Sequence, residues 1–200
     1  MSGPRRRAPA RITVAVSRTA REWRSALPGA AVLARRAARA ALACAAKRDG
    51  RTVRGPAELS LVLADDDLLH HLNRQYRGVD RPTNVLSFPG ADPGRNPPSR
   101  GAANADQPHM LGDVVLAVET VAAEAAAQGK TMADHFTHLV VHGVLHLLGY
   151  DHMTPAEARQ MESLEVEVLA GLGIGDPYRR PATRSAGRRA HPAPRRAARA

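Results

Sequence analysis

The 200-residue sequence contains few aromatic residues, one cysteine and no long apolar run. Phe, Trp and Tyr make up only 3% of the chain, so Leu, Val and Ala must fill most of any core. The single cysteine, Cys44, excludes an internal disulfide and agrees with a reducing compartment. No run of about 18 uninterrupted apolar residues is present, which argues against a membrane span. We therefore expect a cytoplasmic protein without membrane contact, although an Arg-rich, acid-poor N-terminus is also typical of transit peptides.

Charge is distributed unevenly along the chain, whose net charge is +10. Residues 1–54 carry a net +12, residues 55–178 a net −10 and residues 179–200 a net +8. Cationic segments attract polyanions such as RNA, in a salt-dependent way. Biased codon usage explains Ala/Arg/Pro-rich ends equally well. The length suits one domain, so we expect a disordered basic arm at 1–10, a domain at 11–177 and a disordered basic tail at 178–200.

Hydrophobic periodicity predicts four strands and five helices within the domain. The strands are expected at 11–17, 58–64, 84–89 and 111–119, and the helices at 28–50, 65–78, 120–129, 131–148 and 154–172. Residues 90–109, rich in Gly and Pro at their start, predict a flexible loop. Because strands and helices alternate irregularly, we expect an α+β fold, with a small mixed sheet of about four strands packed with about five helices.

Two of the helices carry more detailed predictions. Leu68, Leu69, Leu72 and Tyr76 follow helical spacing and predict the buried stripe of the helix at 65–78. Thr154, Pro155 and Glu157 match a capping box, which predicts that the last helix begins there.

The segment HGVLHLLGYDH, residues 142–152, carries three histidines among apolar residues. His142 and His146 are four residues apart and share a helix face, while Gly149 can end the helix and turn His152 back towards them. Three converging imidazoles favour a zinc site on the long central helix, with the fourth ligand position open as in catalytic sites. A lone His-x-x-x-His pair is usually accidental. This helix, however, is apolar nearly all round, and buried imidazoles need partners.

The remaining histidines are weaker candidates. His135 and His138 continue the stripe and can be either a fourth ligand or a partner that orients a ligand; we favour an orienting or structural role for both. His70 and His71 are expected to be ordinary surface or boundary residues. His109 and His191 have no partner that the sequence suggests.

The histidine spacing, with Gly149 three residues after the second histidine, is also that of metzincin peptidases. In those enzymes a glutamate follows the first histidine and serves as the general base, but here the residue is Gly143. This difference argues against proteolysis. Glycine inside a helix costs about 1 kcal/mol relative to alanine, which predicts that another element or the substrate approaches closely at Gly143.

HGVLHLLGYDH resembles the signature of the YbeY family of bacterial endoribonucleases. YRGVDRPTNVLSFP at 76–89, LGDVVLAVE at 111–119 and GIGDPY at 173–178 resemble further blocks of that family, in the same order. The resemblance covers about residues 58–178, and a weaker resemblance extends back to residue 11. The Arg/Ala-rich ends and the long segment 90–109 depart from the family pattern, which leaves open how substrate is gripped there.

The resemblance implies a zinc-dependent, single-strand-specific endoribonuclease of 16S rRNA 3′-end maturation and ribosome quality control. Its partners would be a single-stranded rRNA precursor and the small ribosomal subunit with its assembly factors. The motif positions imply one zinc ion held by His142, His146 and His152, and a catalytic arginine at Arg77. Independently, a guanidinium can hold two phosphate oxygens, although Arg77 can equally be a surface residue at a helix end.

Other polar residues near these blocks keep two interpretations each. Asp151 and Asp113 can assist a histidine or only complete a turn or a strand, and Ser87 and Asn84 can contact RNA or only complete a strand. No general base is identified. A different zinc hydrolase, such as a peptidase, and a non-catalytic ribosome-associated module with structural zinc remain alternatives.

Overall fold

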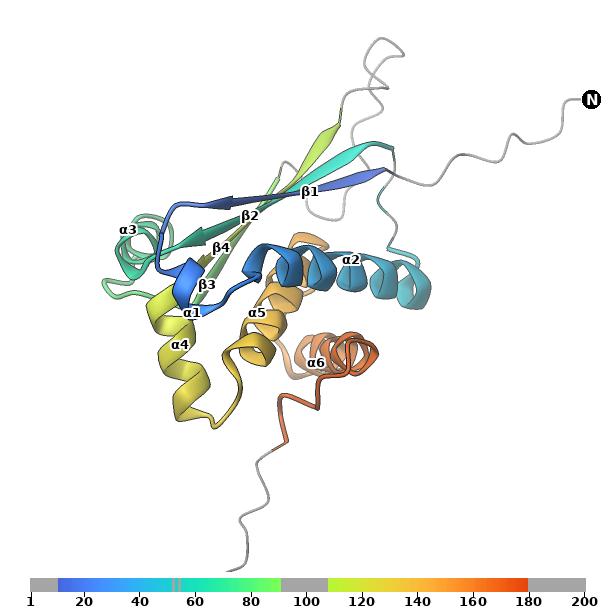
Figure 1. Cartoon of the computed structure of the whole chain (residues 1–200). Helices are drawn as coiled ribbons and strands as arrows, with labels where there is room; N and C mark the ends of the chain where they lie inside the picture. Colours follow the sequence, from blue (N-terminus) through green and yellow to red (C-terminus); the bar gives the residue numbers. More distant parts are fainter. Residues whose placement is uncertain (1–10, 52, 54, 91–107, 180–200) are drawn as a thin grey trace, which may run out of the picture.

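The computed structural model describes residues 11–51, 53, 55–90 and 108–179 (Figure 1). Three predicted segments lie wholly or mostly outside these residues. They are the arm at 1–10, the loop at 90–109 and the tail at 178–200, of which residues 178 and 179 are described. The described part contains four strands and six helices. In chain order these are β1 Ile12–Arg18, α1 Trp23–Ala26, α2 Ala30–Asp49, β2 Ala57–Ala64, α3 Asp66–Arg77, β3 Val85–Pro89, β4 His109–Ala117, α4 Val118–Ala127, α5 Met132–Leu147 and α6 Pro155–Gly171.

The four strands form one mixed sheet in the order β1-β2-β4-β3. β1 and β2 are parallel, β2 and β4 are parallel, and β3 runs antiparallel to β4 at the edge of the sheet. The α+β fold with a small mixed sheet is confirmed. Among the described residues, no helix is both long and apolar enough to cross a membrane.

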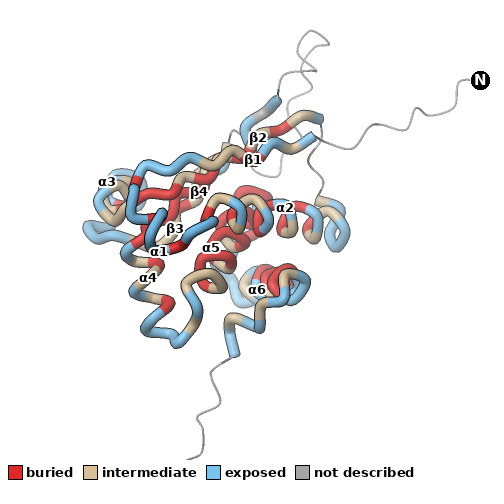
Figure 2. Tube along the Cα trace, in the orientation of Figure 1, coloured by how far each residue is buried: buried red, intermediate tan, exposed pale blue. Residues whose placement is uncertain are grey.

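The two faces of the sheet bury different helices. Side chains alternate along β4, so that Val114 and Leu116 join the large core under α2 and α5, whereas Val115 and Ala117 join a smaller cluster under α3. Figure 2 shows the buried residues concentrated between the sheet and the helices α2, α5 and α6. α5 therefore lies in the middle of the larger core, on the opposite face of the sheet from α3.

Alanine allows close packing at this core, where aromatic residues are scarce. The buried face of α2 consists mostly of alanine, including Ala34, Ala37, Ala38, Ala41 and Ala45. Small side chains let the backbone of α2 approach α5 and the sheet. The single tryptophan, Trp23, is fully buried, donates a hydrogen bond from Nε1 to the Ala64 carbonyl at 2.7 Å, and packs 5.1 Å from the Phe136 ring.

Some details differ from the sequence-based predictions. Tyr76, expected in the buried stripe of α3, is 62% exposed and packs against the Phe88 ring instead. Asn73 takes the buried position one turn earlier, where its side-chain amide donates to the Arg81 carbonyl at 2.8 Å. The short helix α1 was not predicted, because four residues are too few to show a helical period. α4 begins at Val118, two residues before the predicted start.

Candidate metal centre

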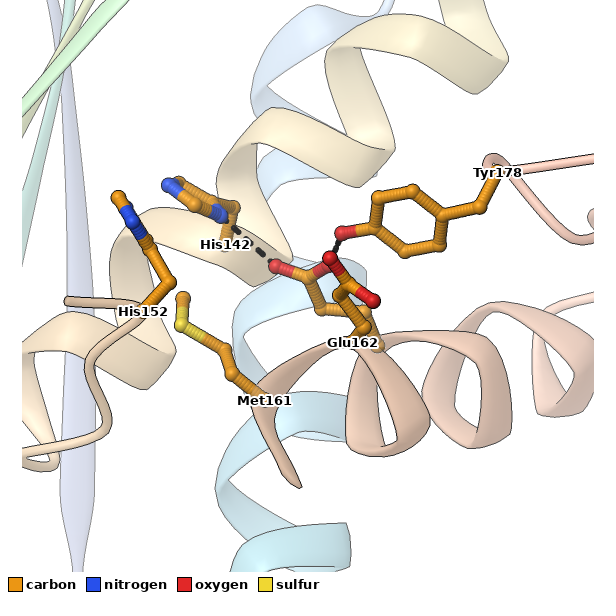
Figure 3. A pocket seen from close by; sticks show the side chains of 6 residues that line it. His142, His152, Met161, Glu162 and Tyr178 are labelled. Atoms are coloured by element: carbon orange, nitrogen blue, oxygen red, sulfur yellow. Dashed lines mark hydrogen bonds and ion pairs between the residues drawn. The ribbon is translucent and has the colours of Figure 1, made fainter. Parts of the chain in front are cut away.

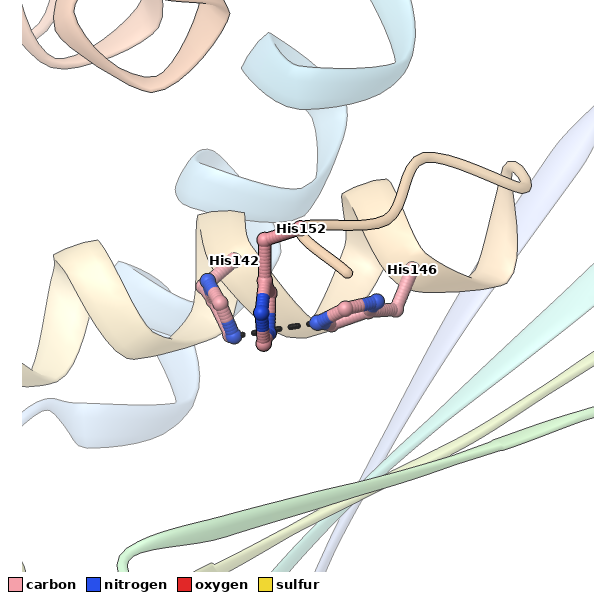
Figure 4. Close-up of side chains that lie close together, drawn as sticks. All are labelled: His142, His146 and His152. Carbon is pink, nitrogen blue, oxygen red and sulfur yellow. Dashed lines mark hydrogen bonds between the residues drawn. The ribbon is translucent and has the colours of Figure 1, made fainter. Parts of the chain in front are cut away.

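The three histidines of the HGVLHLLGYDH segment converge in the structure. The ring centroids of His142 and His146 lie 4.6 Å apart, and the His152 ring lies 5.5 Å and 5.1 Å from them. One ring nitrogen from each residue lies within 4.8 Å of the other two (Figure 4). The predicted convergence of the three rings is therefore confirmed. Two of the rings come from one face of α5 and the third from the turn that follows it.

The turn after α5 has the geometry that the sequence suggested. Gly149 adopts a left-handed backbone conformation, with φ of 80°. The Gly149 amide donates to the His146 carbonyl at 2.9 Å, and the Tyr150 amide donates to the Leu145 carbonyl at 3.1 Å. These two bonds form a Schellman motif, which satisfies the last carbonyls of the helix and reverses the chain. The reversal directs His152 back towards α5.

The end of α2 holds this turn in place. Arg51 donates from Nη1 to the Leu148 carbonyl at 2.6 Å, and its guanidinium lies 4.2 Å from the centre of the Tyr150 ring. The Tyr150 hydroxyl donates to Asp49 Oδ2 at 2.6 Å. Segments about 100 residues apart in the sequence thus fix the position of the loop that carries His152.

The hydrogen bonds of the rings determine which nitrogens are free. His142 Nδ1 lies 2.8 Å from Glu165 Oε1, and His146 Nδ1 lies 3.0 Å from the Tyr150 carbonyl oxygen. Both oxygens are acceptors, so each Nδ1 carries the proton and donates. In the neutral rings both Nε2 atoms then present lone pairs, and these atoms lie only 3.1 Å apart. Two lone pairs at this distance have no proton to share, whereas a cation satisfies both.

Burial keeps His146 neutral at physiological pH. Loss of solvent, with smaller contributions from His142 and His152, lowers the pKa of His146 to about 4. An imidazole must be neutral to bind a metal ion. The donor set, three imidazoles with two Nε2 atoms fixed face to face, therefore fits a zinc ion held by His142, His146 and His152.

Glu165 supports this arrangement from α6. Its side chain is fully buried and accepts hydrogen bonds from His142 Nδ1 and from the Tyr178 hydroxyl (Figure 3). It accepts a third hydrogen bond from His138 Nε2 at 3.3 Å. Burial alone would raise the pKa of Glu165, but these donors outweigh it and lower the pKa to about 2. The ionised carboxylate fixes the tautomer and the orientation of the His142 ring. Partners of this kind commonly orient histidine ligands in metal sites.

Glu165 was not predicted from the sequence, although a signal was present. Glu165 occupies a buried position of α6, whose other buried residues are Met161, Leu164, Val168 and Leu169. A carboxylate inside an apolar helical stripe needs a buried partner. Tyr178 was also missed, because we expected the disordered tail to begin there. It lies within the described residues and contacts Glu165.

His135 and His138 have partners of their own. His135 Nε2 lies 2.8 Å from Glu124 Oε2, and burial lowers the pKa of His135. His138 bonds to Glu165 at 3.3 Å, and its ring also packs edge-on against the His142 ring, with centroids 6.4 Å apart. Neither residue belongs to the group of converging nitrogens found among the described residues. His70, on α3, pairs with Asp80 at 2.7 Å, and His71 is exposed.

Gly143 is where the sheet approaches α5. A Cβ atom at this position would lie 2.5 Å from Val114 Cγ1 and 3.0 Å from Ser87 Oγ. Ser87 also donates from Oγ to the Gly143 carbonyl at 3.2 Å. The predicted close approach of another element is therefore confirmed. Its consequence is that the edge strand β3 lies directly beside the segment that carries His142 and His146.

Arg77 is not in contact with the three histidines. It is the last residue of α3, it is exposed, and no hydrogen bond or ion pair of the described residues joins it to them. α3 also lies on the other face of the sheet from α5. Tyr76, beside Arg77, packs 5.1 Å from the Phe88 ring on β3. The strand β3 thus separates the end of α3 from the histidines, and the role of Arg77 stays a prediction.

The other polar residues named from the sequence have structural contacts. Asn84 donates from its side chain to Glu124 Oε2 at 2.8 Å, and its own Oδ1 accepts from the Val85 amide. Asp151 Oδ1 accepts from the His152 amide at 2.8 Å, which is a bond within the turn. Asp113 lies in β4 opposite Phe88. None of these contacts identifies a general base.

Comparison with known proteins identifies the family. The family model described as Endoribonuclease YbeY matches residues 31–173. The chain belongs to the endoribonuclease YbeY family. Among YbeY proteins, that of Paramagnetospirillum magneticum is 53% identical over 84% of this chain and 96% of its own length. The YbeY protein of Azorhizobium caulinodans is 51% identical over 79% of this chain and 91% of its own length. That of Rhodospirillum rubrum is 48% identical over 84% of this chain and 82% of its own length.

A solved structure also resembles the chain. The solution structure of a Thermotoga maritima protein matches 86% of this chain and 99% of its own chain. The sequence identity is 21% and the TM-score is 0.43. This similarity is too low to support an argument about function. The assignment to the YbeY family depends on the sequence relatives.

Proposed function

We propose that this chain is a zinc-dependent, single-strand-specific endoribonuclease. Its membership of the YbeY family and relatives named Endoribonuclease YbeY at about half identity support an RNA substrate. The observation that carries the proposal is the pair of facing Nε2 atoms on His142 and His146, 3.1 Å apart, with His152 beside them. We further propose action on the 16S rRNA 3′ end and in ribosome quality control, together with the small ribosomal subunit and its assembly factors in the cytoplasm.

Zinc suits the donors that the chain offers. Neutral imidazoles favour zinc over magnesium or calcium, which prefer oxygen ligands. Three protein ligands leave one position of a tetrahedral ion for water or substrate. When bound, the ion would supply Lewis acidity for hydrolysis of a phosphodiester. The chain itself contributes the fixed tautomers of His142 and His146, the ionised Glu165 behind His142, and a loop held by α2.

Arg77 is proposed to contact the RNA backbone. A guanidinium can bind two phosphate oxygens, and Arg77 is exposed with no ion pair among the described residues that would occupy it. Because β3 lies between the end of α3 and the histidines, an RNA strand that crosses the edge of the sheet at β3 would meet both. In this arrangement Arg77 holds a phosphate near the bond that is cleaved, without touching the histidines.

A peptidase is disfavoured by the surroundings of the histidines. The position of the metzincin glutamate is Gly143, and the sheet fills the space beside it. Glu165, the buried acid nearest the rings, already accepts from three donors and is no free base. A panel of peptide substrates, with no cleavage expected, separates this alternative from the proposed one.

The test of the proposal is RNA cleavage by the purified full chain. Single-stranded RNA should be cut by zinc-loaded protein, and the activity should be lost with chelator and in His142→Ala. The matched control is His70→Ala, which removes an exposed histidine on α3 and should retain activity. Duplex RNA of the same sequence should remain intact.

Two results would overturn the proposal. Cleavage that survives both chelation and His142→Ala would exclude the metal centre from the reaction. Absence of cleavage by folded, zinc-loaded protein, together with unchanged RNA binding in His142→Ala, would favour a non-catalytic module with structural zinc.

A further inference from the structure

A pocket adjoins the metal centre on the side of α6. It has a volume of about 230 Å³ and is lined by His142, His152, Met161, Glu162, Glu165 and Tyr178 (Figure 3). Pockets for drug-sized ligands typically measure roughly 300–1,000 Å³, so this one suits a smaller group. Because two of the candidate metal ligands form one wall, a ligand in the pocket would lie beside the metal centre.

Tyr178 presents a fixed aromatic surface to this pocket. Its hydroxyl donates to the buried Glu165 carboxylate, while the residue as a whole remains 46% exposed. The carbonyl of Pro177, the residue before Tyr178, accepts a hydrogen bond from Lys130 Nζ at 3.0 Å. The Tyr178 amide donates to Asp176 Oδ1 at 2.9 Å. The ring is therefore held at its hydroxyl and at its backbone, and much of its surface is available for stacking.

Met161 and Glu162 complete the pocket with an apolar and an acidic wall. Met161 is 1% exposed and belongs to the large core, so it is a fixed part of the lining. Glu162 is exposed, and no hydrogen bond or ion pair with another described residue engages its carboxylate. A free carboxylate beside an aromatic ring can accept hydrogen bonds from the edge of a planar ligand that stacks on that ring.

We propose that this pocket binds one nucleobase of the RNA, stacked on Tyr178 with its polar edge facing Glu162. The inference rests on the proposed function and adds a subsite to it. Single-stranded RNA is commonly recognised by stacking of bases on aromatic side chains and by hydrogen bonds to their Watson–Crick edges. Guanine carries two adjacent donors on that edge, N1–H and the N2 amino group, which match the two oxygens of a carboxylate. The pocket therefore favours guanine.

Nucleotide binding to the full chain tests this subsite without any cleavage. The probes are the four 5′-monophosphates GMP, AMP, CMP and UMP, with ribose 5-phosphate as the probe that lacks a base, titrated calorimetrically. We expect GMP to bind most tightly and ribose 5-phosphate to bind more weakly than all four. Loss of base stacking in Tyr178→Leu should weaken GMP binding by roughly 5- to 150-fold.

Further variants separate stacking from the support that Tyr178 gives to Glu165. Tyr178→Phe also removes the hydroxyl but keeps the ring, so it should retain most of the binding that Tyr178→Leu loses. Tyr76→Leu removes another exposed tyrosine, on the opposite face of the sheet, and should bind GMP as the native chain does. Glu162→Gln should reduce the preference for GMP over the other three nucleotides.

Three outcomes would overturn the inference. The first is that ribose 5-phosphate binds as tightly as GMP. The second is that Tyr178→Phe loses as much affinity for GMP as Tyr178→Leu does. The third is that Tyr76→Leu loses as much affinity for GMP as Tyr178→Leu does. Failure of the proposed function would look different, because base-dependent binding would persist while no RNA is cleaved.

Discussion

Replacing Glu165 with glutamine tests how far the support behind His142 controls the metal centre. The carboxylate has no exposed surface and accepts from His142, His138 and Tyr178. Glutamine has nearly the same shape but only one acceptor oxygen, and its amide group donates. It can satisfy His142 Nδ1 or the other two donors, but not all three, and it carries no charge to hold the proton on Nδ1.

The size of the effect follows from the loss of these bonds. Removing a partner that orients a metal ligand typically weakens metal binding by about 10- to 100-fold. This range corresponds to about 1.4–2.8 kcal/mol, at 1.4 kcal/mol per factor of ten. A hydrogen bond to a charged group contributes about 1.5–3 kcal/mol to stability, so the variant should also unfold at lower denaturant concentration.

Competition with a chromophoric chelator measures the zinc affinity of the folded chain directly. Glu167→Gln is the matched control, because it removes an exposed carboxylate of α6 that pairs with Arg48 at 3.5 Å and should leave the zinc affinity unchanged. Circular dichroism establishes that both variants are folded at the temperature used. If Glu165→Gln binds zinc as tightly as Glu167→Gln, Glu165 does not orient His142 and the reasoning fails.

Three other perturbations have definite expected outcomes. Gly143→Ala should lower the free energy of unfolding in urea by up to about 2 kcal/mol. Overpacking against Val114 costs about 1–3 kcal/mol and outweighs the gain in helix propensity of about 1 kcal/mol. An unchanged midpoint of urea unfolding would contradict this. Arg77→Ala should reduce RNA cleavage without altering the melting temperature, whereas Arg74→Ala, on the same helix, should cleave RNA as the native chain does. Equal cleavage rates in the two variants would remove Arg77 from the mechanism. Burial lowers the pKa of His135 below its usual 6.5, so the unfolded chain takes up the proton first and stability falls as the pH drops below 6.5. The pH dependence of unfolding, measured on chelated protein, should be shallower in His135→Gln, and parallel curves for the two proteins would refute this cause.

Local sequence signals predicted the parts of the structure that short-range geometry controls. The pair His142 and His146 lies on one helix face because side chains four residues apart do so in any α-helix. Gly149 and the capping box of Thr154 and Glu157 set the two ends of the loop that returns His152, and both are present in the structure. The spacing of these residues therefore carried enough information to bring three rings together.

The contacts that were not predicted from the sequence depend on packing between segments far apart in the chain. Glu165 faces His142 only because α6 lies against α5, and Tyr178 reaches Glu165 only because the chain after α6 returns to it. Tyr76 matched a buried helical stripe, but at the last turn of α3 it is exposed beside Phe88. Periodicity assigns a residue to a helix face and does not say which element covers it.

The most direct test of the whole account is the metal content of the native chain. Protein purified without added metal or chelator should contain close to one equivalent of a divalent ion by elemental analysis, and His146→Ala should contain none. Native protein without an ion, and without a saturable one-to-one site when zinc is titrated into it, would contradict the claim that these imidazoles hold a metal.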